Sequence, residues 1–318
     1  MRDRKTTGLF SLPLKIVDVG AAGGLHKRWG PTSGNALSAL LFEPDPAAAA
    51  KLWSGSSVLV SQIALSSETG ESTLYCTRKS TCSSLHRANF SFIRRFPNAQ
   101  RFEITSQIPV IISRLDDEIR RLDFSSPDFV KLDVQGHEAA VLSGAQQTLR
   151  AGIIGIESEI SFGELYENGA KIGDLIDILA PIGFEIFDLR RVYWKRPGGR
   201  HYRGKGQLAV GDALFLLPPE TVADRFAQNQ EKLTAAFRIY CAYHHYDASS
   251  TLLDAIDPGP VKSELELILH ECAGRRDTAL SKAAYRLWSK YLAWVSGWLQ
   301  DRKPTSGKRW QISGDPDF

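Results

Sequence analysis

The chain has 318 residues, which is longer than one ordinary domain. Of these residues, 43% are hydrophobic, which is enough for a sizeable core. Its 39 basic and 36 acidic side chains give a formal charge of +3, so the composition does not call for a nucleic-acid partner. No apolar run of about 18 residues occurs and the N-terminal apolar stretch is too short for a signal peptide. We therefore expect a cytoplasmic protein without a membrane span, with its four cysteines reduced.

Short apolar runs alternate with helical patterns through the first two thirds of the chain. The runs predict strands at 14–20, 37–42, 57–63, 72–77, 108–112, 128–134, 152–158, 184–189 and 207–217. The helical patterns predict helices at 45–53, 114–122, 137–150 and 170–180. Segment 79–106 places arginines beside phenylalanines without a clear period, and we expect a loop and a short helix over the site. This alternation is typical of an open α/β sheet with right-handed crossovers.

The composition changes at Pro218-Pro219, after which only helical periods follow. They predict helices at about 220–245, 249–256, 261–272 and 278–299. We expect three parts: a catalytic domain at 1–217, a helical extension at 218–303 and a disordered tail at 304–318. The last helix carries a tryptophan-rich apolar sector that is expected to pack in a small bundle. The alternative is peripheral membrane contact through 282–299, where basic residues accompany the stripe.

A glycine turn follows the first apolar run and reads Asp18-x-Gly20-x-x-Gly23-Gly24. The next apolar run ends at Glu43, 23 residues after Gly20. Glycines let the backbone approach a ligand closely, and a carboxylate at the second strand end can accept hydrogen bonds from two ribose hydroxyls. The pattern therefore predicts an adenosine-containing cofactor.

The glycine spacing favours one cofactor class over another. A dinucleotide site usually reads G-x-G-x-x-G, but Ala22 stands where the second glycine would be. Asp18 leads the turn, and a carboxylate there suits an amino group better than a phosphate. S-adenosylmethionine, which carries an amino group and an unphosphorylated ribose, is the expected cofactor. An NAD-dependent oxidoreductase is the disfavoured alternative.

Three segments together resemble the FkbM family of S-adenosylmethionine-dependent methyltransferases. They are Asp18-Val19-Gly20-Ala21, Phe42-Glu43-Pro44 and Asp133-Val134-Gln135-Gly136-His137-Glu138. Weaker matches follow in the family's order, among them Ile63-Ala64-Leu65-Ser66, Ser83-Ser84-Leu85, Glu159-Ile160-Ser161-Phe162 and Gly211-Asp212-Ala213-Leu214-Phe215. The resemblance covers about 14–217 and departs at Gln135, where many members carry Glu, and at Ala22, often Asn. It implies a Rossmann-like class I methyltransferase fold, a mostly parallel open sheet flanked by helices, here with a C-terminal all-α extension.

The resemblance and the strand ends together define a candidate donor site. Glu43 is expected to bind the ribose, and Gln62 and Ala64 follow the third strand, where the adenine usually lies. The methionine end is expected to contact the glycine turn and the strand end at Asp133, through Asp18, Gly20, Ala21, Gly23 and Asp133.

Three residues are candidates for the chemistry. Asp133 ends an apolar strand and needs a polar partner there, which leaves a ligand, a metal or helix capping open. His137 is the preferred general base because the ordinary pKa of histidine suits neutral pH, with His86 a weaker competitor. Glu159 is expected to face the acceptor, whereas Glu157 is expected to point elsewhere by strand alternation. No group of ligands has a spacing diagnostic of a metal site.

The sequence thus predicts an S-adenosylmethionine-dependent methyltransferase that O-methylates a sugar, a glycan or a natural product. The expected partners are this small-molecule or glycan acceptor and a second copy of the chain, with no nucleic acid. A non-catalytic donor-binding fold with a partner-recruiting helical module is the rival hypothesis.

Overall fold

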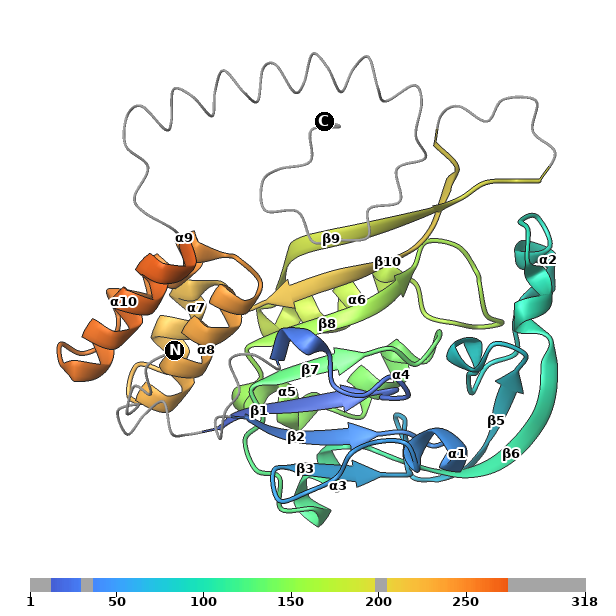
Figure 1. Cartoon of the computed structure of the whole chain (residues 1–318), viewed down its shortest axis with the longest axis horizontal. Helices are drawn as coiled ribbons and strands as arrows, with labels where there is room; N and C mark the ends of the chain where they lie inside the picture. The colour runs from blue at the N-terminus through green and yellow to red at the C-terminus, as the bar shows by residue number, and fades with distance from the viewer. Residues whose placement is uncertain (1–12, 30–36, 198–204, 274–318) are drawn as a thin grey trace.

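The computed structural model describes residues 13–29, 37–197 and 205–273. Its centre is a seven-stranded sheet in the order β3-β2-β1-β7-β8-β10-β9 (Figure 1). The strands are β1 (Leu14–Val19), β2 (Leu37–Phe42), β3 (Val58–Ser61), β7 (Phe129–Leu132), β8 (Gly155–Ser161), β9 (Glu185–Trp194) and β10 (Gln207–Leu216). Only β10 runs antiparallel to its neighbours, β8 and β9. The predicted Rossmann-like architecture, a mostly parallel open sheet flanked by helices, is confirmed.

The strand order reverses between β1 and β7. From β1 the chain moves outward through β2 to β3, and it then returns to the other side of β1 at β7. In open α/β sheets this switch point is where ligands bind, beyond the carboxyl ends of the strands.

A second, three-stranded sheet adjoins the switch point, in the order β4 (Ala64–Leu65), β6 (Ile104–Ser113) and β5 (Gly70–Thr77). The connection from β5 to β6 contains the short turns η2 (Ser80–Cys82) and η3 (Ala99–Phe102) on either side of α2 (Phe90–Ile93). The expected loop and short helix at 79–106 are therefore confirmed.

Helices cover the sheet: α1 (Pro46–Ala49), α3 (Leu115–Arg121), α4 (Glu138–Ser143), α5 (Gln146–Gly152) and α6 (Ile172–Leu179). Asp45 caps α1 as its sequence indicates, because the Ala47 amide donates to Asp45 Oδ1 at 2.9 Å. The single helix predicted at 137–150 is wrong, since the chain breaks at Gly144. A Cβ on Gly144 would lie 2.0 Å from the carbonyl oxygen of Ser66, so that contact needs a glycine.

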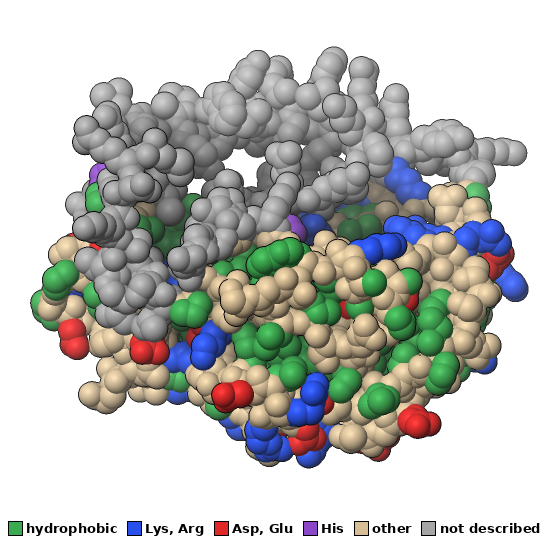
Figure 2. All heavy atoms as spheres, turned by 60° about the horizontal axis from the view of Figure 1, so that its bottom comes forward, with side chains coloured by type: hydrophobic (Ala, Val, Ile, Leu, Met, Phe, Trp, Pro, Cys, Tyr) green, Lys and Arg blue, Asp and Glu red, His purple; other side chains and the backbone are tan. Residues whose placement is uncertain are grey.

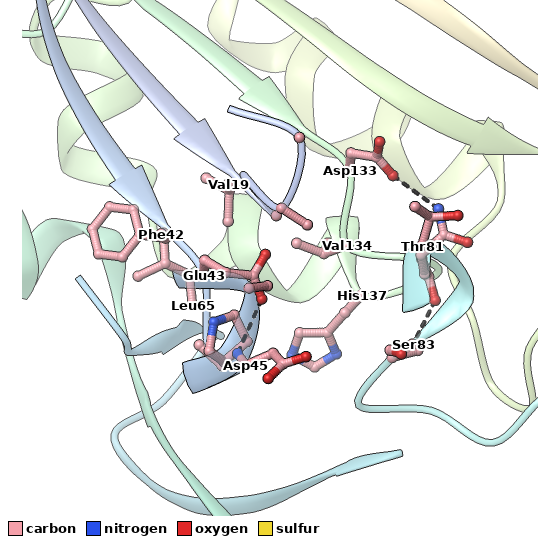
Figure 3. A pocket seen from close by; sticks show the side chains of 18 of the residues that line it. Val19, Phe42, Glu43, Asp45, Leu65, Thr81, Ser83, Asp133, Val134 and His137 are labelled. Atoms are coloured by element: carbon pink, nitrogen blue, oxygen red, sulfur yellow. Dashed lines mark hydrogen bonds between the residues drawn. The ribbon is translucent and has the colours of Figure 1, made fainter. Parts of the chain in front are cut away.

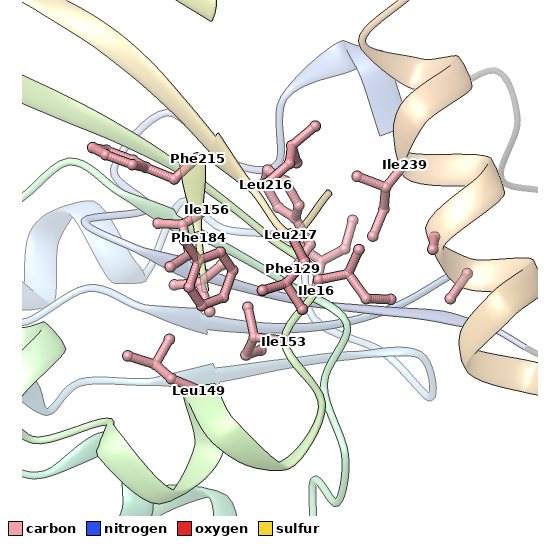
Figure 4. Close-up of a cluster of buried hydrophobic side chains, with 14 of the residues drawn as sticks. Ile16, Phe129, Leu149, Ile153, Ile156, Phe184, Phe215, Leu216, Leu217 and Ile239 are labelled. Carbon is pink, nitrogen blue, oxygen red and sulfur yellow. The ribbon is translucent and has the colours of Figure 1, made fainter. Parts of the chain in front are cut away.

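Four helices follow the sheet: α7 (Pro219–Arg225), α8 (Gln230–Ala242), α9 (Tyr246–Leu253) and α10 (Pro260–Ala273). The predicted helix at 220–245 is thus two helices, and Asn229 caps the second by accepting from the Lys232 amide at 3.0 Å. They dock at the amino ends of the parallel strands, opposite the strand carboxyl ends (Figure 1). Phe237 and Ile239 of α8 are fully buried in the same core as Ile16 (Figure 4).

A buried amino group joins α8 to the sheet. Lys232 Nζ donates to Asp128 Oδ1 at 2.6 Å and to the carbonyl oxygens of Ser126, Pro127 and Gly152 at 2.9–3.0 Å. These partners precede β7 and β8, which places the extension away from the strand ends that carry the predicted site. The helix predicted at 278–299 and the tail at 304–318 lie outside the described residues. No helix in the described part of the chain is long and apolar enough to cross a bilayer.

Candidate active site

A cavity of about 640 Å³ opens at the carboxyl ends of β1, β2 and β7 (Figure 3). Its walls come from the glycine turn after β1, from the ends of β2 and β7, from β4 and from the loop after η2. Gly20, Gly23, Glu43, Ala64, Asp133 and His137 of the predicted residues line it. Its volume is in the range of small-molecule sites.

The glycine turn is held by the neighbouring strands. The amides of Gly20 and Ala21 both donate to the Phe42 carbonyl, at 3.0 and 3.1 Å. Gly20 has φ +80°, and a Cβ there would lie 2.0 Å from the carbonyl oxygen of Asp133. The turn therefore needs glycine at 20 because the protein's own backbone crowds it. Ala21 is buried and does not line the cavity, whereas Gly23 borders it with open space at its Cβ position.

Glu43 projects from the end of β2 into the cavity (Figure 3). Its Oε1 accepts from the Asp45 amide at 3.0 Å, which orients the carboxylate. Burial raises the pKa of Glu43, and the Asp45 amide partly offsets that effect. A buried, oriented carboxylate of this kind can bind a pair of hydroxyls.

Asp18 lies behind the cavity wall, and a lysine separates it from Asp133. Asp18 is 1% exposed, and Lys131 Nζ donates to its Oδ1 at 3.1 Å. Lys131 Nζ is also 3.9 Å from Asp133 Oδ2, whose side chain is 44% exposed. Burial opposes the charge of Lys131, but Asp18 and Asp133 together raise its pKa. Lys131 lines the cavity, and sequence reasoning missed it although a lysine inside the apolar run 129–132 was a usable signal.

Gln135 connects Asp133 to Glu159. Its Nε2 donates to Asp133 Oδ1 at 2.8 Å and to Glu159 Oε2, while Tyr166 donates to its Oε1 at 2.7 Å. Ser84 donates to its backbone carbonyl at 2.7 Å, and its φ of +56° is an uncommon conformation for a side chain of this size. Several bonds therefore hold this backbone, and the family departure at 135 places a neutral amide between two carboxyl groups.

Glu159 does not line the cavity. Burial, followed by the charge of Asp133, raises its pKa well above the usual value, which favours the protonated carboxyl group. The expectation that Glu157 points elsewhere by strand alternation is wrong, because residues two apart on a strand share a face. The two differ in partners, since Glu157 accepts from Arg28 Nη1 at 2.7 Å and from the Tyr243 hydroxyl.

His137 lines the cavity with both ring nitrogens engaged. Nδ1 is 2.9 Å from His86 Nε2, and Nε2 is 3.0 Å from Ser66 Oγ. Burial, with a contribution from His86, lowers the pKa of His137 to about 4. The ring is thus neutral at pH 7, but neither nitrogen is left to receive a ligand's proton in this arrangement.

The remaining predicted residues separate in space. Ala64 borders the cavity, whereas Gln62 lines a different hollow with Pro44 and Ile108. Asp133 caps no helix, because α4 begins at Glu138 after His137. Among the described residues, no group of three His, Cys, Asp or Glu side chains is placed to hold a metal ion.

Comparison with known families decides the affiliation of this fold and site. The methyltransferase FkbM domain matches residues 18–186, which is more than half of the chain. The chain belongs to the FkbM methyltransferase family. The matched range begins at the end of β1 and contains the glycine turn, Glu43, Lys131 and the Asp133–Glu159 network, so the family domain includes the residues that line the cavity.

Solved methyltransferases are similar at low sequence identity. A methyltransferase FkbM from Methylobacillus flagellatus is 16% identical with a TM-score of 0.35, over 63% of this chain and 43% of that protein, so the FkbM chain described here spans less than half of its length. The magnesium protoporphyrin IX methyltransferase of Synechocystis, solved with bound SAM, is 10% identical with a TM-score of 0.32, over 65% and 71% of the two chains. A SAM-dependent methyltransferase from Anabaena variabilis is 9% identical with a TM-score of 0.33, over 65% and 77%. No curated protein matches the chain.

Proposed function

We propose that this FkbM-family protein transfers the methyl group of S-adenosylmethionine to a hydroxyl of a sugar, a glycan or a natural product. The observation that carries the donor assignment is the Glu43 carboxylate, oriented by the Asp45 amide at the switch-point cavity. Its position at the end of β2 suits the two ribose hydroxyls of an adenosine group.

The residues around the cavity fit the rest of this donor. S-adenosylmethionine ends in an amino acid with one positive and one negative group. Lys131, which lines the cavity, offers an ammonium to the carboxylate of this amino acid. Asp18 Oδ2 is buried and accepts no hydrogen bond from the described residues, so Asp18 retains an unused acceptor beside Lys131.

The same region fits a dinucleotide poorly. A pyrophosphate binds at the amino end of a helix that follows the glycine turn. Here the described residues after the turn form only the short 3₁₀ turn η1 (Lys27–Trp29), and no α-helix begins in the described range 20–29. The methyl-donor assignment is therefore favoured over the oxidoreductase alternative.

Among the three candidate catalytic residues, the contacts favour Asp133 as the group that receives the acceptor's proton. Its carboxylate lines the cavity and is partly exposed, held by Gln135 and close to Lys131. Both nitrogens of His137 are engaged, and Glu159 does not line the cavity and has a pKa raised well above its usual value. In this assignment Asp133 accepts the hydroxyl proton as the new C–O bond forms and the methyl–sulfur bond breaks, while His137 positions the loop at His86 against Ser66.

The test is methyl transfer from isotopically labelled S-adenosylmethionine to a panel of hydroxylated sugars and natural products, with amines and carboxylic acids as comparison acceptors. Asp133→Asn should lower kcat by roughly 10²-fold or more, as expected for loss of a general base. Glu159→Gln should have a much smaller effect. Loss of turnover in His137→Ala or Glu159→Gln, with Asp133→Asn active, would move the base to the affected residue.

The rival hypothesis of a non-catalytic module gives a different result. Such a protein would bind S-adenosylmethionine in calorimetry and yet turn over no hydroxyl acceptor. Preferential transfer to amines or carboxylic acids would instead contradict the O-methylation part of the proposal.

A further inference from the structure

We propose that the methyl acceptor carries phosphate or sulfate groups, which bind to a collar of five arginines beside the cavity. The arginine collar consists of Arg87, Arg94, Arg95, Arg101 and Arg196. This inference rests on the proposed function, because it names the chemical class of the molecule that the same site would methylate.

The collar adjoins the cavity wall. The Lys79 amide donates to the Arg101 carbonyl at 3.0 Å, and the next two residues, Ser80 and Thr81, line the cavity. Arg87 follows two residues after Leu85, which also lines it. α2 and the end of β9 lie at the end of the molecule to which the parallel strands point (Figure 1). Arg196 follows the last residue of β9, Trp194, by two residues. An anion bound to the collar would therefore sit on the acceptor side of the cavity.

Aromatic rings hold the guanidinium groups in place. Each guanidinium lies 4.5–5.4 Å from the centre of a ring: Arg87 over Tyr75 at 4.5 Å, Arg94 over Phe90 at 5.2 Å, Arg95 over Phe92 at 5.2 Å, Arg101 over Phe102 and Trp194 at 4.8 Å, and Arg196 over Phe96 at 5.4 Å. The rings contact one another, since Phe96 lies 5.3 Å from Trp194 and 5.5 Å from Phe92. A stacked guanidinium keeps its N–H edges available, so the collar is preorganised for oxyanions.

The collar has no acidic partners among the described residues. None of its five arginines forms an ion pair with any other described residue, and the hydrogen bonds of Arg95 and Arg196 go to the neutral oxygens of Ser91 and Gln207. Between residues 78 and 103 the sequence has six basic residues and one acidic residue, Glu103, which pairs with Arg78.

The same chain shows what an ordinary solvated arginine surface looks like. On and beside α3, the arginines at 114, 120 and 121 all pair with a carboxylate of Asp117 or Glu118 at 2.5–2.7 Å. On the face shown in Figure 2, basic and acidic side chains mix along the lower edge, while basic side chains gather toward the end where Figure 1 places α2. Unpaired like charges repel, so guanidinium groups held together on a rigid aromatic base would be stabilised by an anionic ligand.

The size and setting of the collar favour an acceptor over a nucleic acid. A nucleic-acid surface needs an extended basic stripe, whereas this chain has a net charge of only +3 and its collar lies beside segments that line a cavity of about 640 Å³. A phosphorylated or sulfated glycan can place one oxyanion on the collar and a hydroxyl near Asp133.

The test measures binding of the full-length protein to fluorescent sulfated dextran, phosphorylated dextran and neutral dextran of the same length, and to a single-stranded DNA oligonucleotide of matched charge. The collar variant is R94Q/R95Q, in which both arginines are exposed. The control variant is R114Q/R120Q, which removes the same charge beside α3, where no residue lines the cavity. Affinity for S-adenosylmethionine is measured in parallel for each protein.

We expect the charged dextrans to bind and the neutral one not to bind. R94Q/R95Q should weaken charged-dextran binding by about tenfold or more, since two charge-assisted contacts are lost, with the control within about twofold. The better-bound charged dextran identifies the oxyanion. Equal weakening in both variants, or tighter binding of the oligonucleotide than of either charged dextran, would overturn the proposal. Unchanged S-adenosylmethionine affinity in R94Q/R95Q separates a failure of the collar from a failure of the donor site.

Discussion

Replacement of Glu43 is the most direct test of the donor site. The backbone around it is set by sheet pairing, because the Glu43 amide donates to the Ser61 carbonyl at 3.0 Å and the Phe42 carbonyl accepts from the glycine turn. Removal of the side chain should therefore leave the strand end in place. Glu43→Ala and Glu43→Gln then report on the ligand contact and not on folding.

The expected magnitude follows from the number of hydrogen bonds. A hydrogen bond to a charged group contributes about 1.5–3 kcal/mol, which corresponds to about tenfold to 150-fold in affinity. The carboxylate faces two ribose hydroxyls in the proposed complex, but its own desolvation, visible in the raised pKa, offsets part of the gain. We therefore expect Glu43→Ala to weaken S-adenosylmethionine by at least about tenfold. Glu43→Gln should lose less, since one oxygen can still accept from the Asp45 amide.

Calorimetric titration with S-adenosylmethionine measures this effect, with thermal unfolding as the check on the fold and Glu71→Ala, an exposed glutamate on β5, as the control. The ionised carboxylate is the better acceptor, and burial raises the pKa of Glu43. As the pH is lowered, donor affinity should therefore begin to fall at a higher pH than it would for a glutamate with an ordinary pKa. This pH dependence should be absent in Glu43→Ala. Unchanged donor affinity in a folded Glu43→Ala protein would refute the assignment.

Three further predictions concern the scaffold. Lys232→Met should lower the free energy of unfolding by about 3–5 kcal/mol, because it leaves Asp128 without its buried partner. Urea denaturation measures this change, with Lys262→Met as the control. Equal free energies of unfolding for the two variants would show that the Lys232–Asp128 ion pair is unimportant. Burial raises the pKa of Glu138 to about 7, so the neutral acid stabilises the fold at low pH, and that contribution is lost as pH rises from about 4.5 through about 7. The free energy of unfolding of the native chain relative to Glu138→Gln should fall by about 3 kcal/mol over this range, and a constant difference would contradict the assignment. Truncation after Leu217 should expose apolar surface and reduce solubility, which dye binding measures, and an equally soluble fragment would show that the extension is independent.

Local patterns in the sequence indicated most of the elements and the position of Glu43 at the cavity. Alternating apolar runs mark the strands because burial on both faces selects continuous apolar residues. Glu43 could be found because it ends one strand at a set distance from a glycine turn. Four of the collar's arginines and the phenylalanines beside them were visible as the segment 79–106, but the position of Arg101 over Trp194, which comes from β9, was not.

Only the tertiary structure decided which polar groups meet. Lys131 bonds Asp18 across 113 residues, and His137 meets His86 across 51 and Ser66 across 71. No spacing rule in the sequence encodes such contacts, because they depend on which strands are neighbours and on how far each loop folds back over the sheet. That packing engages both nitrogens of His137 and leaves Asp133 at the cavity surface. It also breaks the predicted helix at Gly144, where a carbonyl from a distant strand end leaves no room for a side chain.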